Sequence, residues 1–140
     1  MKERAELVVG WLRKAQSDLV ALEVTLQARA LDASCFHAQQ AAEKYLKAFL
    51  THHGVAFPYT HNLAKVLDFC AQIDADFRSL LPRVEPLTPY AVRPRYDASF
   101  WPSLEAAEEA RSAAIAVRDF VLGRLPESLR KETSKPQCKT

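Results

Sequence analysis

The chain has 140 residues, of which 49% are hydrophobic and 26% charged, and a formal net charge of +2 at pH 7. This length suits a single domain that buries its core without disulfide or metal staples. No apolar run reaches the ~18 residues that a membrane span needs, and the charged start of the chain lacks the apolar segment of a signal peptide, so we expect a cytoplasmic protein.

Apolar spacing predicts two long helices that form a hairpin. The second helix begins at a cap formed by Asp32 or Ser34 and ends at Gly54, with Pro58 shortly beyond. Since only a few residues join the two helices, they must pack antiparallel. The first helix, at about residues 2–29, repeats apolar side chains at intervals of three and four: Val8, Trp11, Ala15, Leu19, Leu22 and Leu26.

The second half of the chain combines shorter helices with a proline-rich connection. A helix at about residues 62–72 is followed by one or two further helical turns. Closely spaced prolines exclude a long helix beyond them, and we expect residues 82–102 to be irregular. The last helix begins at Pro102 or Ser103, ends near Leu125, and has a face of small residues that permits close helix approach.

The pattern as a whole predicts an all-α fold. We expect an up-and-down bundle of four or five helices over residues 1–125, with an irregular proline-rich connection before the last helix. Residues 126–140 carry four basic and two acidic side chains, whereas residues 1–125 carry 15 of each. We interpret residues 126–140 as a disordered basic tail, and the mildly basic composition is therefore no evidence for a nucleic-acid surface on the domain.

Four segments, in chain order, resemble the HEPN domain family. The segment that begins at Cys35 (CFHAQQAAEKYLKAFLTHHG) is similar to the second helix of these domains, with its alanine-rich Q-x-A-x-E-K-x-L-K-A core. Residues 11–22 (WLRKAQSDLVAL), 60–67 (THNLAKVL) and 87–97 (LTPYAVRPRYD) resemble three further family segments, so that the resemblance covers about residues 8–122. It implies an up-and-down helical bundle that pairs as a homodimer.

Many HEPN proteins are metal-independent RNases that use an arginine followed four to six residues later by a histidine. In such a site the histidine transfers protons, while the arginine stabilises the negative charge of the phosphate. None of the four histidines of this sequence lies downstream of Arg93 or Arg95, and Asp97 is a poor substitute for a neutral imidazole. The motif is therefore absent. We leave enzyme activity open, favour its absence and assign no catalytic residue.

Arg93, Arg95 and Tyr96 form the densest polar cluster of the proline-rich connection. The guanidinium group of arginine can donate two parallel hydrogen bonds to phosphate oxygens, and a tyrosine ring can stack on a base. We therefore predict a ligand site here. The alternative is that Arg95 pairs with a carboxylate and Tyr96 fills the mouth of the bundle. Lys47 is a further candidate for a phosphate contact, although its spacing from Glu43 also fits an ion pair on a solvated helix face, which we favour.

His61 completes the predicted ligand set, although a histidine just before a helix more often caps the helix or bonds a backbone carbonyl. His52 and His53 are too isolated to indicate a metal site. The three cysteines form no C-x-x-C pair, so we expect neither a metal nor a cofactor. Cys35 and Cys70 lie in apolar contexts and are expected in the core.

Three functions remain open. The first is a homodimeric HEPN subunit that binds a nucleotide or RNA phosphate and acts with a minimal nucleotidyltransferase partner, as in a toxin–antitoxin pair. The second is a divergent metal-independent RNase toxin, and the third is a structural interaction protein without a ligand. The missing histidine argues against the second.

Overall fold

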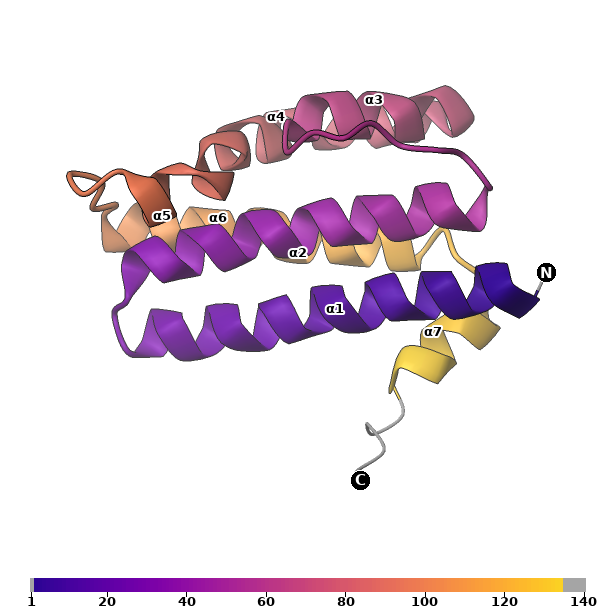
Figure 1. Cartoon of the computed structure of the whole chain (residues 1–140), viewed down its shortest axis with the longest axis horizontal. Helices are drawn as coiled ribbons and strands as arrows, with labels where there is room; N and C mark the ends of the chain where they lie inside the picture. The colour runs from indigo at the N-terminus through magenta and orange to yellow at the C-terminus, as the bar shows by residue number, and fades with distance from the viewer. Residues whose placement is uncertain (1, 135–140) are drawn as a thin grey trace.

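The computed structural model of the chain describes residues 2–134, and this part contains helices and no strand. Two long helices, α1 (Lys2–Gln27) and α2 (Leu31–His52), lie antiparallel, and α6 (Leu104–Leu122) packs against α2 on its far side in Figure 1. None of the described helices is both long and apolar enough to cross a membrane. The predicted all-α bundle is confirmed.

Short helices form the third layer of the molecule, above α2 in Figure 1. In chain order they are α3 (Leu63–Ile73), the 3₁₀ helix η1 (Ala75–Leu80), α4 (Leu81–Val84), the 3₁₀ helix η2 (Glu85–Ala91) and α5 (Arg93–Tyr96). Most of the connection that we expected to be irregular is therefore helical in short pieces. The physical reason is that a proline lies at the first or second position of α4, η2 and α5, where its missing N–H costs no helical hydrogen bond.

The start of α2 also differs from expectation. Neither Asp32 nor Ser34 caps the helix, because α2 begins earlier, with Ala30 as an N-cap that offers no side-chain bond. The Ser34 hydroxyl instead donates to the carbonyl of Ala30 and lies 3.0 Å from the hydroxyl of Thr25 on α1. The two helices of the hairpin are thus joined by a polar contact at their closed end.

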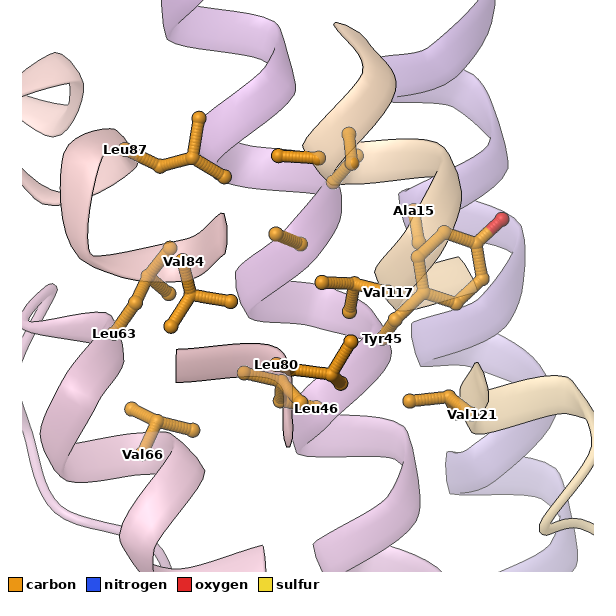
Figure 2. Close-up of a cluster of buried hydrophobic side chains, with 14 of the residues drawn as sticks. Ala15, Tyr45, Leu46, Leu63, Val66, Leu80, Val84, Leu87, Val117 and Val121 are labelled. Carbon is orange, nitrogen blue, oxygen red and sulfur yellow. The ribbon is translucent and has the colours of Figure 1, made fainter. Parts of the chain in front are cut away.

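The core lies where α2 meets the other layers. Cys35 and Cys70 are fully buried in it, as expected from their apolar contexts. Burial of such side chains is the main stabilising term of a bundle of this size. Figure 2 shows that the core draws on α1, α2, α6 and the short helices, through Ala15, Tyr45, Leu46, Leu63, Val66, Leu80, Val84, Leu87, Val117 and Val121.

A last helix, α7 (Glu127–Ser134), occupies much of the segment that we expected to be a disordered tail. It packs against α1, and Leu129 contacts the hydrophobic core. The structure therefore differs here from the disordered tail that we expected. Residues 135–140 of the expected tail lie outside the described residues. The domain boundary at residue 125 stays a prediction.

Candidate ligand-binding site

Arg95 is fixed between two aromatic rings at one end of the bundle. Its Cζ lies 5.0 Å from the ring centroid of Phe36 on α2 and 5.0 Å from that of Tyr96. Its Nε and Nη2 donate to the carbonyl oxygen of Ala91, at 3.3 and 3.0 Å. These contacts set the plane of the guanidinium, while Nη1 takes part in neither hydrogen bond. The arginine–aromatic cluster (Phe36, Arg95 and Tyr96) therefore presents a positioned cationic edge.

Neither structural alternative for this segment holds. Arg95 bonds a backbone carbonyl rather than a carboxylate. The Tyr96 side chain is 73% exposed, so it does not fill the mouth of the bundle. An exposed tyrosine beside a fixed guanidinium is a suitable surface for a planar base.

Arg93 lies apart from the arginine–aromatic cluster. Residues two apart on a helix point to different sides, and the Cζ of Arg93 lies 4.6 Å from the ring centroid of Phe100. Its Nε donates to Asp97 at 3.4 Å. Hydrogen bonds from Ser99, and a smaller effect of Arg93, lower the pKa of Asp97 despite slight desolvation. The carboxylate is thus ionised at neutral pH and partly neutralises Arg93.

Two exposed apolar side chains near α5 were missed by sequence reasoning. Val92 is 51% exposed and Trp101 is 75% exposed. The sequence signal for Trp101 was its place in the short loop before the last helix, where no helical periodicity could bury it. Exposed tryptophan is unusual in a monomer surface and typical of contacts with ligands or partners.

Lys47 and His61 lie together on Glu43, far from α5. The Nζ of Lys47 is 2.7 Å from one oxygen of Glu43, and the Nδ1 of His61 is 3.0 Å from the other. Because α2 rises 1.5 Å per residue, Lys47 lies about 16 Å along the helix axis from Phe36. The structure therefore brings two predicted site residues together, but in a separate place from the arginines.

In the Glu43 cluster (Gln39, Glu43, Lys47 and His61), Gln39 and Glu43 are buried, whereas His61 is exposed. The side chains of Glu43 and Lys47 are only 6% and 14% exposed, so the solvated helix face that we favoured is wrong. Burial raises the pKa of Glu43, but hydrogen bonds from Lys47, His61 and Gln39 outweigh it, and the pKa is lowered. His61 does not cap α3 either, since Asn62 takes that position. Its role in the structure is to tie the segment before α3 to α2.

The amine of Lys47 also lies over aromatic rings. Its Nζ is 5.5 Å from the ring centroid of Trp11 on α1 and 5.0 Å from that of Phe57. A cation–π contact of this kind adds to the ion pair with Glu43 in holding the amine. To bind a phosphate, Lys47 would have to leave both, which makes it a less available contact than Arg95.

A second polar link, missed by sequence reasoning, joins α1 and α2. One oxygen of Asp18 lies 2.9 Å from the Nδ1 of His37, and the other accepts from the Nζ of Lys44 at 2.6 Å. Burial raises the pKa of Asp18, but hydrogen bonds from His37 and Lys44 outweigh it, so the pKa is lowered. The sequence signal was that Asp18 interrupts the hydrophobic stripe of the first helix, while His37 and Lys44, seven residues apart, lie on one face of the second.

An open groove of about 550 Å³ lies between η2 and α6. Glu105, Glu108 and Glu109 line it, with Arg83 opposite. Three carboxylates repel a phosphate, so this groove does not suit the predicted ligand. Among the described residues, no group of three or more His, Cys, Asp or Glu side chains is arranged to hold a metal. The arginine–aromatic cluster remains the candidate site.

Three packed helical layers, with a short arginine-bearing helix just before the last long helix, define a small all-α domain. The chain belongs to the HEPN domain family, whose model matches residues 8–125. The crystal structure of TT1696 from Thermus thermophilus aligns with a TM-score of 0.71 and 26% identity, over 84% of this chain and 98% of that chain.

The fold recurs in the crystal structure of ST0689, an archaeal HEPN homologue, with a TM-score of 0.66 and 22% identity over 84% of this chain and 96% of that one. No curated protein matches the chain. The family predicted from the four sequence segments is thus confirmed.

Proposed function

We propose that this HEPN-domain protein binds a nucleotide or an RNA phosphate at the end of the bundle where α5 lies. The observation that carries the proposal is the fixed guanidinium of Arg95, held by Phe36, Tyr96 and the carbonyl of Ala91 with an edge left free. A cation that is already ordered loses little conformational entropy when it binds, so more of each contact appears as affinity.

Within this site, Arg95 is the main phosphate contact and Tyr96 the stacking surface. Arg93 contributes a weaker, partly neutralised charge from the adjacent side of α5. Lys47 and His61 join the site only where a ligand extends along α2 and displaces their contacts with Glu43. Binding, rather than catalysis, is supported by the absence of a histidine after either arginine.

We further propose that the protein is a homodimer in the cytoplasm and acts with a minimal nucleotidyltransferase partner, as in a toxin–antitoxin pair. Membership of the HEPN family supports this proposal. The exposed side chains of Val92 and Trp101 beside α5 offer apolar contact area for a second chain. The divergent RNase and the ligand-free interaction protein are the alternatives.

Calorimetric titration with nucleotides and short RNA tests the proposal. Each charge-assisted arginine contact contributes about 1.5–3 kcal/mol, so Arg93→Ala/Arg95→Ala should weaken binding by at least one to two powers of ten. Binding of the wild type should also weaken as salt rises, since counterions compete for the phosphate. Arg78→Ala is the matched control, because Arg78 is an exposed arginine paired with Asp68 on another face.

Three outcomes would count against the proposal. Equal binding by a folded double variant would make α5 a structural element. No binding by the wild type would leave the interaction protein as the better account. Cleavage of the RNA during the titration would favour the RNase.

A further inference from the structure

His37 borders the arginine–aromatic cluster from the side of α1. The ring centroids of His37 and Phe36 are 5.2 Å apart, and the Cζ of Arg95 lies 5.0 Å from the same Phe36 centroid. The imidazole and the guanidinium carbon are therefore at most about 10 Å apart. Sequence spacing hides this relationship, because His37 lies on α2 and Arg95 on α5.

Asp18 fixes the orientation of the His37 ring. Its carboxylate holds Nδ1 at 2.9 Å, and none of the described residues bonds Nε2. The His37 side chain is 27% exposed, so a ligand can reach it. The charged groups that the structure places on this ring are Asp18 and, through the same carboxylate, Lys44. Since Asp18 holds Nδ1, Nε2 is the ring nitrogen that can face a ligand.

Arg93 is less suitable than His37 as a second phosphate contact in the same site. It points to the other side of α5, toward Phe100, and Asp97 partly neutralises it. A ligand held by both Arg95 and His37 has to pass over Phe36, which both groups border. An extended strand can do this with one phosphate on each group, while the aromatic ring offers apolar contact to a base or ribose.

We propose that His37 is the second phosphate-binding group beside Arg95, and that the ligand is a single strand of nucleic acid that places successive phosphates on the two groups. This inference rests on the proposed function, since it names the class of ligand that the Arg95 site takes. Asp18 is a positioning residue that acts through His37.

The test compares ApApA, which has two phosphodiesters, with ApA, which has one. Wild type should bind ApApA about tenfold more tightly than ApA, because the second phosphate gains a charge-assisted contact. His37→Gln should abolish this advantage, whereas Arg95→Ala should weaken binding of both compounds. Asp18→Asn should reduce the advantage of ApApA over ApA without weakening the binding of ApA itself. His53→Gln, at the opposite end of α2, is the matched control and should change neither.

Unfolding curves of each variant show whether it is folded before its affinity is compared. Where His37→Gln does not fold, the same comparison is made on His37→Lys, whose amine can also donate to the second phosphate and should keep the advantage.

The outcomes separate this inference from the proposed function. Equal affinity of the wild type for ApApA and ApA, or an advantage that survives in folded His37→Gln, would overturn the role of His37 and leave Arg95 as a single phosphate contact. ADP binding as tightly as ApApA, with equal sensitivity to His37→Gln, would overturn the single-strand ligand. Failure of the wild type to bind any of these compounds would overturn both proposals.

Discussion

The Nδ1 of His61 lies 3.0 Å from a carboxylate oxygen of Glu43, and this contact ties the segment before α3 to the middle of α2. The other oxygen of Glu43 accepts from the Nζ of Lys47 at 2.7 Å. Removing one partner of a buried ion pair leaves the other charge without compensation, which costs more than the pair itself contributes. This arrangement makes Glu43 a stability determinant although the resemblance places it in a family motif.

Glu43→Gln should lower the free energy of unfolding by about 3–5 kcal/mol, since the buried amine of Lys47 loses its counter-charge. Urea denaturation followed by circular dichroism measures the change. Glu108→Gln on the exposed side of α6 is the control and should stay within about 0.5 kcal/mol of the wild type. An unchanged midpoint for Glu43→Gln would show that the cluster contributes nothing to stability.

Stability should fall in acid because of Asp18 and Glu43. For both groups burial raises the pKa but hydrogen bonds outweigh it, so each folded-state pKa lies below its ordinary value. Groups of this kind contribute stability above the unfolded-state pKa, and that contribution disappears as pH falls through the folded-state pKa, here below about pH 4. Urea midpoints between pH 7 and pH 3 should drop less steeply in Asp18→Asn/Glu43→Gln. If the urea midpoint depended on pH in the same way in the variant and the wild type, Asp18 and Glu43 would not be the source of the acid sensitivity.

Cys35 and Cys70 should resist alkylation in the folded protein. Burial raises the pKa of the Cys35 thiol to about 11 and that of Cys70 to about 12. At pH 8 both are therefore protonated, and both are fully shielded from solvent. Peptide mapping after iodoacetamide treatment should find these two cysteines unmodified in buffer and modified in concentrated urea. Rapid native labelling of either one would mean that the bundle opens locally.

Light scattering at micromolar concentration should give twice the chain mass of 15.7 kDa, in line with the proposed homodimer. The small residues of the last helix are not spare surface, because Ala107, Ala110, Ala113 and Ala114 are buried within the protomer. The exposed side chains of Val92 and Trp101 are apolar candidates for the interface. A species of 15.7 kDa alone would rule out the dimer.

The spacing of apolar residues and the helix-terminating glycines and prolines predicted the long helices, because the apolar faces of these helices are continuous along the chain. The buried cysteines followed from the same faces. The proline-rich connection was misjudged because a proline that breaks a long helix also favours the first turn of a short one. The two arginines were interpreted as one cluster, yet Phe36 and Phe100 draw Arg95 and Arg93 to different sides of α5.

The polar links of α2 could not be predicted from spacing either. Whether Asp18 faces His37 depends on how the two helices of the hairpin are rotated about their axes. Whether Glu43 is buried depends on where the segment that carries His61 crosses α2. Both are set by packing between elements that are distant in sequence, and local pattern carries little information about them.

Side-chain NMR of the arginine guanidinium groups tests the central claim most directly. On addition of short RNA, the Nε–H resonance of Arg95 and the backbone amides of Phe36 and Tyr96 should shift together and saturate with the affinity measured by calorimetry. The resonance of Arg78, an exposed arginine on η1, should stay in place. Saturating shifts that leave Arg95 unmoved, or that map to the glutamate-lined groove between η2 and α6, would contradict the account.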